Sequence, residues 1–259
     1  MPIEYACAGN VGYITLNRPP ANSYDADGLD ELARAIDTAA ADAGARVVVL
    51  RSAIERFFCA GADVRYLTEA SIEDNLDLID RAHAALSRIA RIPKPFIALI
   101  QGHALGGGLE IALACDLRFG AEGTYAIGLP EAGLGLIPGN GGTQRLARLI
   151  GPTRALDLMI TARRLAPPEA LQLGILNRLF PTAEAAEHTR EYAEQLANGA
   201  SFAIGAIKQA VWQGVKLALE DGLKLEKSFV EPVLRGTEIQ EGVRAFREKR
   251  KPVFHQGDE

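Results

Sequence analysis

Two kinds of hydrophobic pattern divide the chain, and this division constrains the fold more than any other feature. Up to about Pro181, short β-branched runs alternate with longer amphipathic helical patterns; after it, only helical patterns follow. Such alternation indicates strand–helix units rather than an all-helical or all-strand chain. We therefore expect an α/β core followed by a helical region, and the segment Asn198-Gly199-Ala200 is the most evident break between them.

The individual elements follow from the same periodicities. Strands are predicted at residues 11–16, 47–51, 96–101 and 125–127. Helices are predicted at residues 25–43, 71–89, 182–197, 202–219, 223–234 and 237–249. The second helix places Ile72, Leu76, Ile79, His83 and Leu86 on one core-facing stripe, and Ser71 followed by Asp74 predicts its N-cap. We place the boundary near residue 195, which gives a core at residues 1–195 and a helical region at residues 196–259.

Composition excludes several classes of function. The net charge is −5 with both signs interspersed, so nothing favours general binding to nucleic acid or to an anionic membrane. No apolar run is long enough to span a bilayer and the N-terminus lacks a signal pattern, so we expect a cytoplasmic protein. Cys7, Cys59 and Cys115 are widely spaced and are predicted to be buried thiols. The four histidines do not cluster with possible ligands, so no metal site is predicted.

Three glycine-bearing stretches carry the functional signal, since each lies between a strand pattern and a helix pattern. They span residues 59–63, 102–110 and 130–145. Three adjacent glycines cost roughly 1 kcal/mol each in a helix interior relative to alanine, so Gly106-Gly107-Gly108 is better explained as a turn and helix start. Such a terminus suits an anion or a developing oxyanion, although a turn without a ligand explains the stretch equally well when it is taken alone. The spacing matches neither a dinucleotide fingerprint nor a phosphate loop, so neither NAD nor ATP is predicted.

Taken together, the stretches resemble the enoyl-CoA hydratase/isomerase (crotonase) family in order, spacing and content. The likeness rests on Asp63 after Ala-Gly-Ala, Glu110 behind the triple glycine, and Pro130-Glu131 before a Gly-Leu-Ile-Pro-Gly loop, and it runs from Asn17 to Lys251. It implies a crotonase-like (ClpP/crotonase) spiral of ββα turns whose C-terminal helices assemble trimers or dimers of trimers. It also implies an acyl-CoA substrate of fatty acid metabolism, with coenzyme A present as part of the thioester and no separate cofactor.

The resemblance also implies roles for residues at matching positions. The backbone N–H groups of Ala62 and Gly107 would form an oxyanion hole for the thioester carbonyl. Glu110 would activate water for attack on the β-carbon, and Glu131 would deliver a proton to the α-carbon. The presence of both carboxylates favours hydration of a 2,3-unsaturated acyl-CoA to a 3-hydroxyacyl-CoA over simple isomerisation. For Glu110, we expect a dry pocket to raise the carboxyl pKa more than the helix N-terminus lowers it.

Contacts with coenzyme A are implied at more exposed positions. The residues in question are Arg56, Ala60, Asp63 and Arg65 around the first glycine stretch, and Phe246 and Lys249 reaching in from a neighbouring subunit. Ordinary solvated charges are the alternative interpretation of the arginines and the lysine.

Departures from the family pattern leave the substrate and the reaction open. Residues 120–128 look one residue longer than usual, and Asn140 occupies a position where a small or apolar residue is common. Residues 21–25 replace a frequent Leu-Asn-Ala run and are expected to face the acyl chain. Isomerisation, hydrolytic ring opening and decarboxylation use the same oxyanion hole and are the alternatives. A non-catalytic or RNA-binding relative is disfavoured, because the chain is acidic and residues 31–43 are poor in Lys and Arg.

Overall fold

Two sheets form the centre of the computed structural model, which describes residues 3–254. The larger sheet has the order β1 (Ile3–Ala8), β2 (Val11–Leu16), β3 (Val47–Ser52), β5 (Phe96–Ile100), β7 (Leu117–Ala121) and β10 (Arg178–Phe180). The smaller sheet has the order β4 (Phe57–Cys59), β6 (His103–Leu105), β8 (Ile127–Gly128) and β9 (Arg164–Leu165). Neighbouring strands are parallel except in the pairs β1–β2 and β8–β9.

The chain winds between the sheets in repeated turns. The helices are α1 (Ala26–Ala41), α2 (Val64–Glu69), α3 (Ile72–Arg91), α4 (Gly107–Ala114), α5 (Gly142–Ile150), α6 (Pro152–Ile160), α7 (Pro167–Gln172), α8 (Ala185–Ala197), α9 (Ser201–Gly214), α10 (Leu219–Arg235) and α11 (Glu238–Arg247), with a 3-10 turn η1 at Glu131–Leu134. The pairs β3–β4, β5–β6 and β7–β8 each give one strand to each sheet before the chain enters helices. This arrangement confirms the expected spiral of ββα turns.

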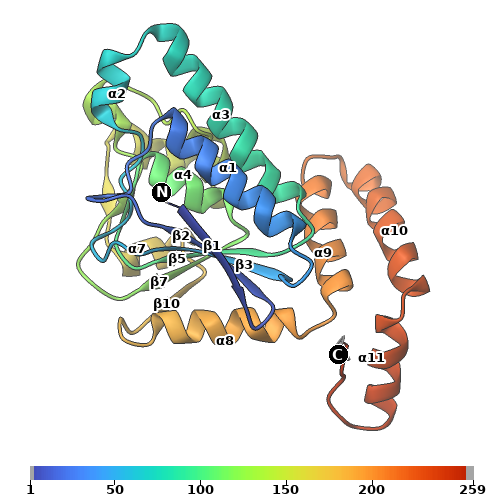
Figure 1. The fold of residues 1–259 in the computed structure, drawn as a ribbon. Coiled ribbons are helices and arrows are strands. Elements are labelled where there is room, and N and C mark those ends of the chain that lie inside the picture. The colour runs from blue at the N-terminus through green and yellow to red at the C-terminus, as the bar shows by residue number, and fades with distance from the viewer. Residues whose placement is uncertain (1–2, 255–259) are drawn as a thin grey trace.

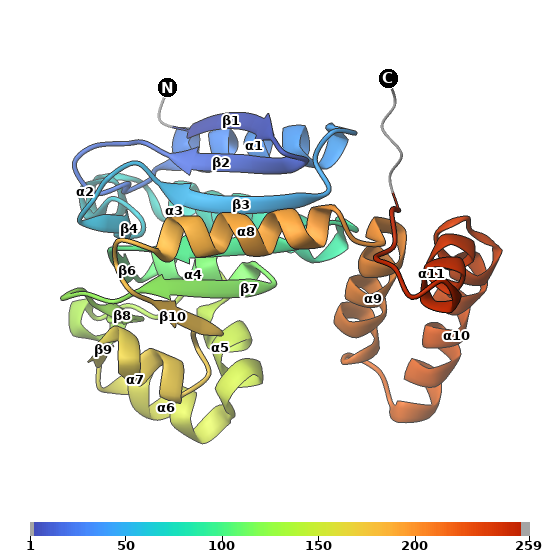
Figure 2. The same ribbon diagram turned by 90° about the horizontal axis from the view of Figure 1, so that it is seen from below.

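Both faces of the larger sheet are buried, as its parallel order requires. Alternate residues of β3 point to opposite faces of the sheet. Val48 and Leu50 lie in the core beneath α1, α3 and α4, whereas Val47 and Val49 lie in a second core beneath α8. Figures 1 and 2 show α1 and α3 on one side of the sheet and α8 along the other. Strand β5, which leads to the second glycine-bearing stretch, is buried along its whole length.

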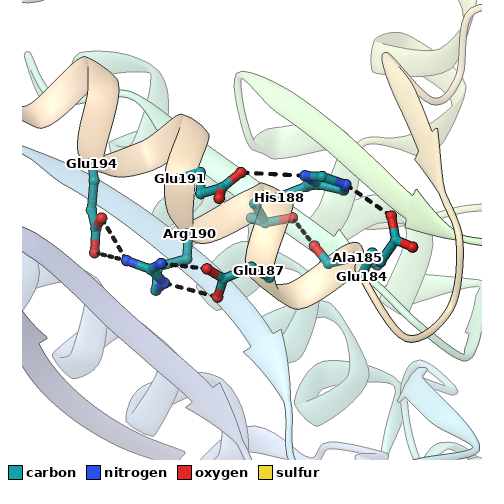
Figure 3. A network of polar contacts seen from close by, with 8 residues as sticks. Glu184, Ala185, Glu187, His188, Arg190, Glu191 and Glu194 are labelled. Carbon is teal, nitrogen blue, oxygen red and sulfur yellow. Dashed lines mark hydrogen bonds and ion pairs between the residues drawn. The ribbon is translucent and has the colours of Figure 1, made fainter.

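Helix α8 illustrates how sequence divides a helix into a packed face and a solvated face. Its buried residues are Ala185, Thr189, Ala193 and Ala197. On the solvated face, Arg190 pairs with Glu187 and Glu194, and His188 lies between Glu184 and Glu191 (Figure 3). The hydrogen bonds to Glu184 and Glu191 raise the pKa of His188. These exposed pairs support the helix locally, while the small buried residues let it lie close to the sheet.

The C-terminal helices lie to one side of the sheets and are joined to them through α9 (Figure 2). Lys208 is 7% exposed, and its Nζ lies 2.7 Å from Asp116 Oδ2 and 2.7 Å from the carbonyl oxygen of Ile89. Trp212 Nε1 donates to Asp116 Oδ1 at 2.6 Å. By contrast, α10 buries none of its residues and exposes apolar side chains, among them Leu219, Leu223, Val230 and Leu234. The division into two domains at residue 195, which falls inside α8, stays a prediction.

Several local predictions were wrong. Cys7 is exposed, because β1 is an edge strand whose residues are mostly solvent-facing, whereas Cys59 and Cys115 are buried as predicted. His83 lies on the exposed side of α3, where its Nε2 is 2.7 Å from the carbonyl oxygen of Gly139. Ile72 and Leu76 are 74% and 57% exposed. The core stripe of α3 is instead Leu78, Ala82, Ala85, Leu86 and Ile89.

Other local predictions were confirmed or incomplete. Ser71 and Asp74 form a full capping box at the start of α3. The strands β1, β4, β6, β7, β9 and β10 were not predicted, since most are very short or lack a clean alternating run. Across residues 3–254, no helix is both long and apolar enough to cross a membrane.

Candidate active site

One cavity of about 400 Å³ collects residues from all three glycine-bearing stretches. Its apolar wall comprises mainly Val64, Leu67, Leu78, Ile79, Leu105, Leu134, Leu136 and Ile137. Its polar side chains are Asn75, Glu110, Glu131, Asn140 and Arg164, and its backbone wall includes Ala60, Ala62 and Gly107. The few polar groups therefore face a largely apolar space, as in many small-molecule sites.

Two adjoining turns bring unpaired backbone amides to the cavity wall. Gly61 and Gly106 have φ angles of 94° and 54°, which glycine adopts without strain. A Cβ placed on Gly61 would lie 2.9 Å from the amide nitrogen of Gly107, so the turns are in contact. Within residues 3–254, the N–H groups of Ala62 and Gly107 meet no hydrogen-bond acceptor. The site therefore offers two neighbouring donors, one of them at the N-terminus of α4.

Glu110, in the first turn of α4, is only 1% exposed. Its Oε1 accepts hydrogen bonds from the amides of Asn140 at 2.8 Å and Gly142 at 2.6 Å. Burial raises the pKa of Glu110 to about 7 despite these two donors, and the nearby charge of Glu131 adds to the increase. This confirms that burial outweighs the stabilising groups. Its second oxygen, Oε2, makes no hydrogen bond with any residue that the structure describes.

Glu131 opens the 3-10 turn η1 and is partly buried. A Cβ placed on Gly106 would lie 3.0 Å from its Oε1, so the carboxyl group lies over the turn that leads into α4. Its Oε2 is buried and finds no partner among residues 3–254. Burial raises the pKa of this carboxyl as well. A buried carboxyl without partners keeps its proton more readily, which suits a proton donor.

The geometry defines what this arrangement can do. Two amide donors can stabilise negative charge on a bound oxygen, and two carboxyl groups with raised pKa values can exchange protons beside it. Residues 7–257 match the model of the enoyl-CoA hydratase/isomerase family. The chain belongs to the enoyl-CoA hydratase/isomerase family.

Individual relatives of this family support the assignment over almost the whole chain. A probable enoyl-CoA hydratase of Bacillus subtilis is 37% identical over 246 residues, which cover 94% of this chain and 95% of the relative. An enoyl-CoA isomerase/hydratase of Mycosarcoma maydis is 41% identical over 209 residues, which cover 81% and 76%. An enoyl-CoA hydratase structure from Geobacillus kaustophilus, 42% identical, superposes with a TM-score of 0.95 and covers 97% and 96%. The fold is therefore that of the crotonases.

The predicted catalytic positions lie together. Ala62, Gly107, Glu110 and Glu131 all line the cavity, and so does Ala60, for which a contact with coenzyme A was predicted. The structure thus places the two amides and the two carboxyl groups of the predicted enolate chemistry around one space. What each group does there stays a prediction.

The other predicted coenzyme A positions lie outside the cavity lining. Arg56, Asp63 and Arg65 do not line the cavity, and Asp63 caps α2 by accepting a hydrogen bond from the amide of Arg65 at 2.9 Å. Phe246 is 84% exposed on α11, and Lys249 follows that helix. Figures 1 and 2 place α11 at the opposite end of the molecule from α2, so a single chain does not bring these two residues to its own cavity. The coenzyme contacts stay predictions.

Two features of the site were missed by sequence reasoning. The first is the amide cradle for Glu110, by which we mean the backbone N–H groups of Asn140 and Gly142 that donate to Glu110 Oε1. It forms where the chain turns through Gly141 at a φ of 104°. The run of glycines in this stretch was a usable signal, because close backbone approach is what it permits. The second is Tyr24: residues 21–25 were expected to face the acyl chain, but none lines the cavity, and Tyr24 packs behind its wall.

Proposed function

We propose that this protein hydrates a 2,3-unsaturated acyl-CoA to the 3-hydroxyacyl-CoA. The observation that carries the proposal is the pairing of Glu110 and Glu131, two carboxyl groups with raised pKa values that line one apolar cavity beside two unpaired amides. Hydration needs a base and an acid at once, because water loses a proton while the α-carbon gains one. The probable hydratase from Bacillus subtilis and the hydratase fold from Geobacillus kaustophilus support this reading.

The chemistry begins with the thioester oxygen bound by the amides of Ala62 and Gly107. Ionised Glu110 takes a proton from water through its free oxygen, and the water oxygen forms a bond to the β-carbon. The double-bond electrons move to the thioester and give an enolate whose oxygen charge the amides stabilise, at roughly 3 to 4 kcal/mol per donor. Glu131 then gives its proton to the α-carbon, and the enolate collapses to product. Glu110 ends protonated and Glu131 ionised, so exchange with solvent must restore both.

The electrostatics of the pair fit a working range near neutral pH. With a pKa of about 7, Glu110 ionises within reach of physiological pH and keeps a strong affinity for a proton. Since the base must be ionised, the hydration rate should increase as pH increases through about 7.

The proposal is tested with purified protein and trans-2-enoyl-CoA substrates of several chain lengths, including branched and ring-bearing ones. Hydration removes the conjugated double bond, so the absorbance of the enoyl thioester should decrease, and mass analysis should show one added water. A product of unchanged mass would show that the protein isomerises the substrate instead of hydrating it. No reaction across the panel would refute the proposal.

A subunit assembly is also part of the proposal, as a homotrimer or a dimer of trimers. Two observations support it. Helix α10 exposes apolar side chains that a neighbouring copy would cover. Phe246 and Lys249 lie far from the cavity of their own chain and would contact that of a neighbouring copy. Light scattering should give three or six times the chain mass of 27.7 kDa. A monomer at working concentration would contradict this assembly.

A further inference from the structure

Tyr24 connects the two amide-bearing turns from behind the cavity wall. It is 6% exposed and forms a parallel bridge with Ala62: its N–H donates to Gly61 O at 3.0 Å, and its carbonyl accepts from the amide of Asp63 at 2.8 Å. Its side chain reaches the second turn, because a Cβ placed on Gly107 would lie 1.8 Å from its hydroxyl oxygen. Tyr24 therefore lies against both turns: its backbone bonds to the residues on either side of Ala62, and its hydroxyl lies beside Gly107.

Asn140 extends this connection to the predicted base. Its Nδ2 donates to the Tyr24 hydroxyl at 2.5 Å, while its own amide donates to Glu110 Oε1 at 2.8 Å. Its carbonyl oxygen accepts from Arg145 at 2.8 Å, so the backbone of this turn is held on both sides. Asn140 is 7% exposed and lines the cavity. The pair thus links the amide turns to the cradle of Glu110 through a single side-chain hydrogen bond.

We propose that Tyr24 and Asn140 act as positioning residues, whose hydrogen bond fixes the position of Glu110 relative to the oxyanion donors. The proposal rests on the hydratase function, since that reaction needs the enolate oxygen and the attacked carbon held at set distances from the donors and the base. The two positions belong to two of the three segments that depart from the family pattern, and here they contact each other. The proposal gives both residues a positioning role and assigns neither a contact with the reacting atoms.

The size of the effect follows from this geometry. Loss of the bond leaves the Tyr24 ring and the backbone bridge to Ala62 in place, so the fold and substrate binding should change little. The turn that carries the Asn140 amide gains freedom, and a misplacement of about 1 Å near the chemistry can cost 100-fold in rate. We expect turnover to fall by roughly 10- to 100-fold with KM changed less than about threefold.

The test uses Tyr24→Phe, Asn140→Ala and the double variant. Kinetics on the best enoyl-CoA should show a kcat loss in each single variant, and the double variant should lose no more than the worse single one, because all three remove the same bond. A second measurement needs no substrate: the carboxyl titration of Glu110, followed by carbon NMR and assigned with Glu110→Gln. A looser amide cradle should raise the Glu110 pKa in both single variants. The other groups whose charges act on Glu110 are Glu131 and Arg145, and all variants retain them.

The outcomes are separable. If the wild-type protein hydrates nothing, the proposed function fails, while the titration still reports on the link between Tyr24 and Glu110. If Tyr24→Phe keeps wild-type kcat and an unchanged Glu110 titration, or if the single losses simply add, the positioning role is wrong. A lower melting temperature with unchanged kinetics and titration would show a structural role instead.

Discussion

Replacing Glu110 by glutamine should stabilise the protein at high pH while it removes the predicted base. The folded-state pKa of about 7 lies above the ordinary 4.5, so the folded protein holds this proton more tightly than the unfolded chain. The protonated Glu110 carboxyl therefore makes its full contribution to the free energy of unfolding below about pH 4.5, and this contribution is lost as pH rises through 7. The difference of about 2.5 pKa units corresponds to about 3 kcal/mol at pH 8 or above.

Glutamine keeps an oxygen that can accept from the amides of Asn140 and Gly142, and it cannot ionise. Chemical denaturation at pH 4 and at pH 8 should show the variant roughly equal to wild type at the lower pH and about 3 kcal/mol more stable at the higher. Glu226→Gln on α10, where the carboxyl is exposed, is the control and should show no such pH dependence. If Glu110→Gln and wild type differ by the same amount at both pH values, the carboxyl does not carry the raised pKa assigned to it.

Three further substitutions test the site and its support. Glu131→Gln should lower turnover at least about 100-fold while calorimetry shows unchanged coenzyme A binding, and near wild-type turnover would show that another group is the acid. Gly107→Ala should abolish hydration, because the new Cβ would lie 1.8 Å from a buried tyrosine hydroxyl; an active variant with the wild-type rate would contradict that packing. Asp116→Ala leaves the buried Lys208 ammonium without its carboxylate partner and should lower the free energy of unfolding, measured by denaturation, by about 3 to 5 kcal/mol. Asp221→Ala removes one partner of an exposed pair and should change it little.

Sequence periodicity predicted the elements whose burial is regular. Residues 47–50 and 96–100 are apolar on both faces of a covered sheet, so β3 and β5 were predicted nearly to their ends. Short strands such as β6 have too few residues to show a period, and they were missed. On α3 the apolar side chains form more than one stripe, because Leu78 faces the core while Ile72 is exposed, and periodicity alone could not choose between them.

The site was predictable in its residues and not in its connections. The glycine turns are visible in the local sequence, because close backbone approach requires glycine. The two glutamates were assigned by the resemblance to the family. The bond between Tyr24 and Asn140 joins positions 116 residues apart, and no local pattern reports such a contact. The same holds for the cradle of Glu110, whose donors lie 30 and 32 residues further along the chain.

The most direct test of the account is a crystal structure with a bound saturated acyl-CoA, which has no double bond to hydrate. The thioester oxygen should lie about 3 Å from the amide nitrogens of both Ala62 and Gly107, at hydrogen-bonding distance. The β-carbon should face the free oxygen of Glu110, and the α-carbon should face Glu131. A thioester oxygen bound away from the two amides, or an acyl chain outside the cavity that the two carboxyl groups line, would contradict the proposed mechanism.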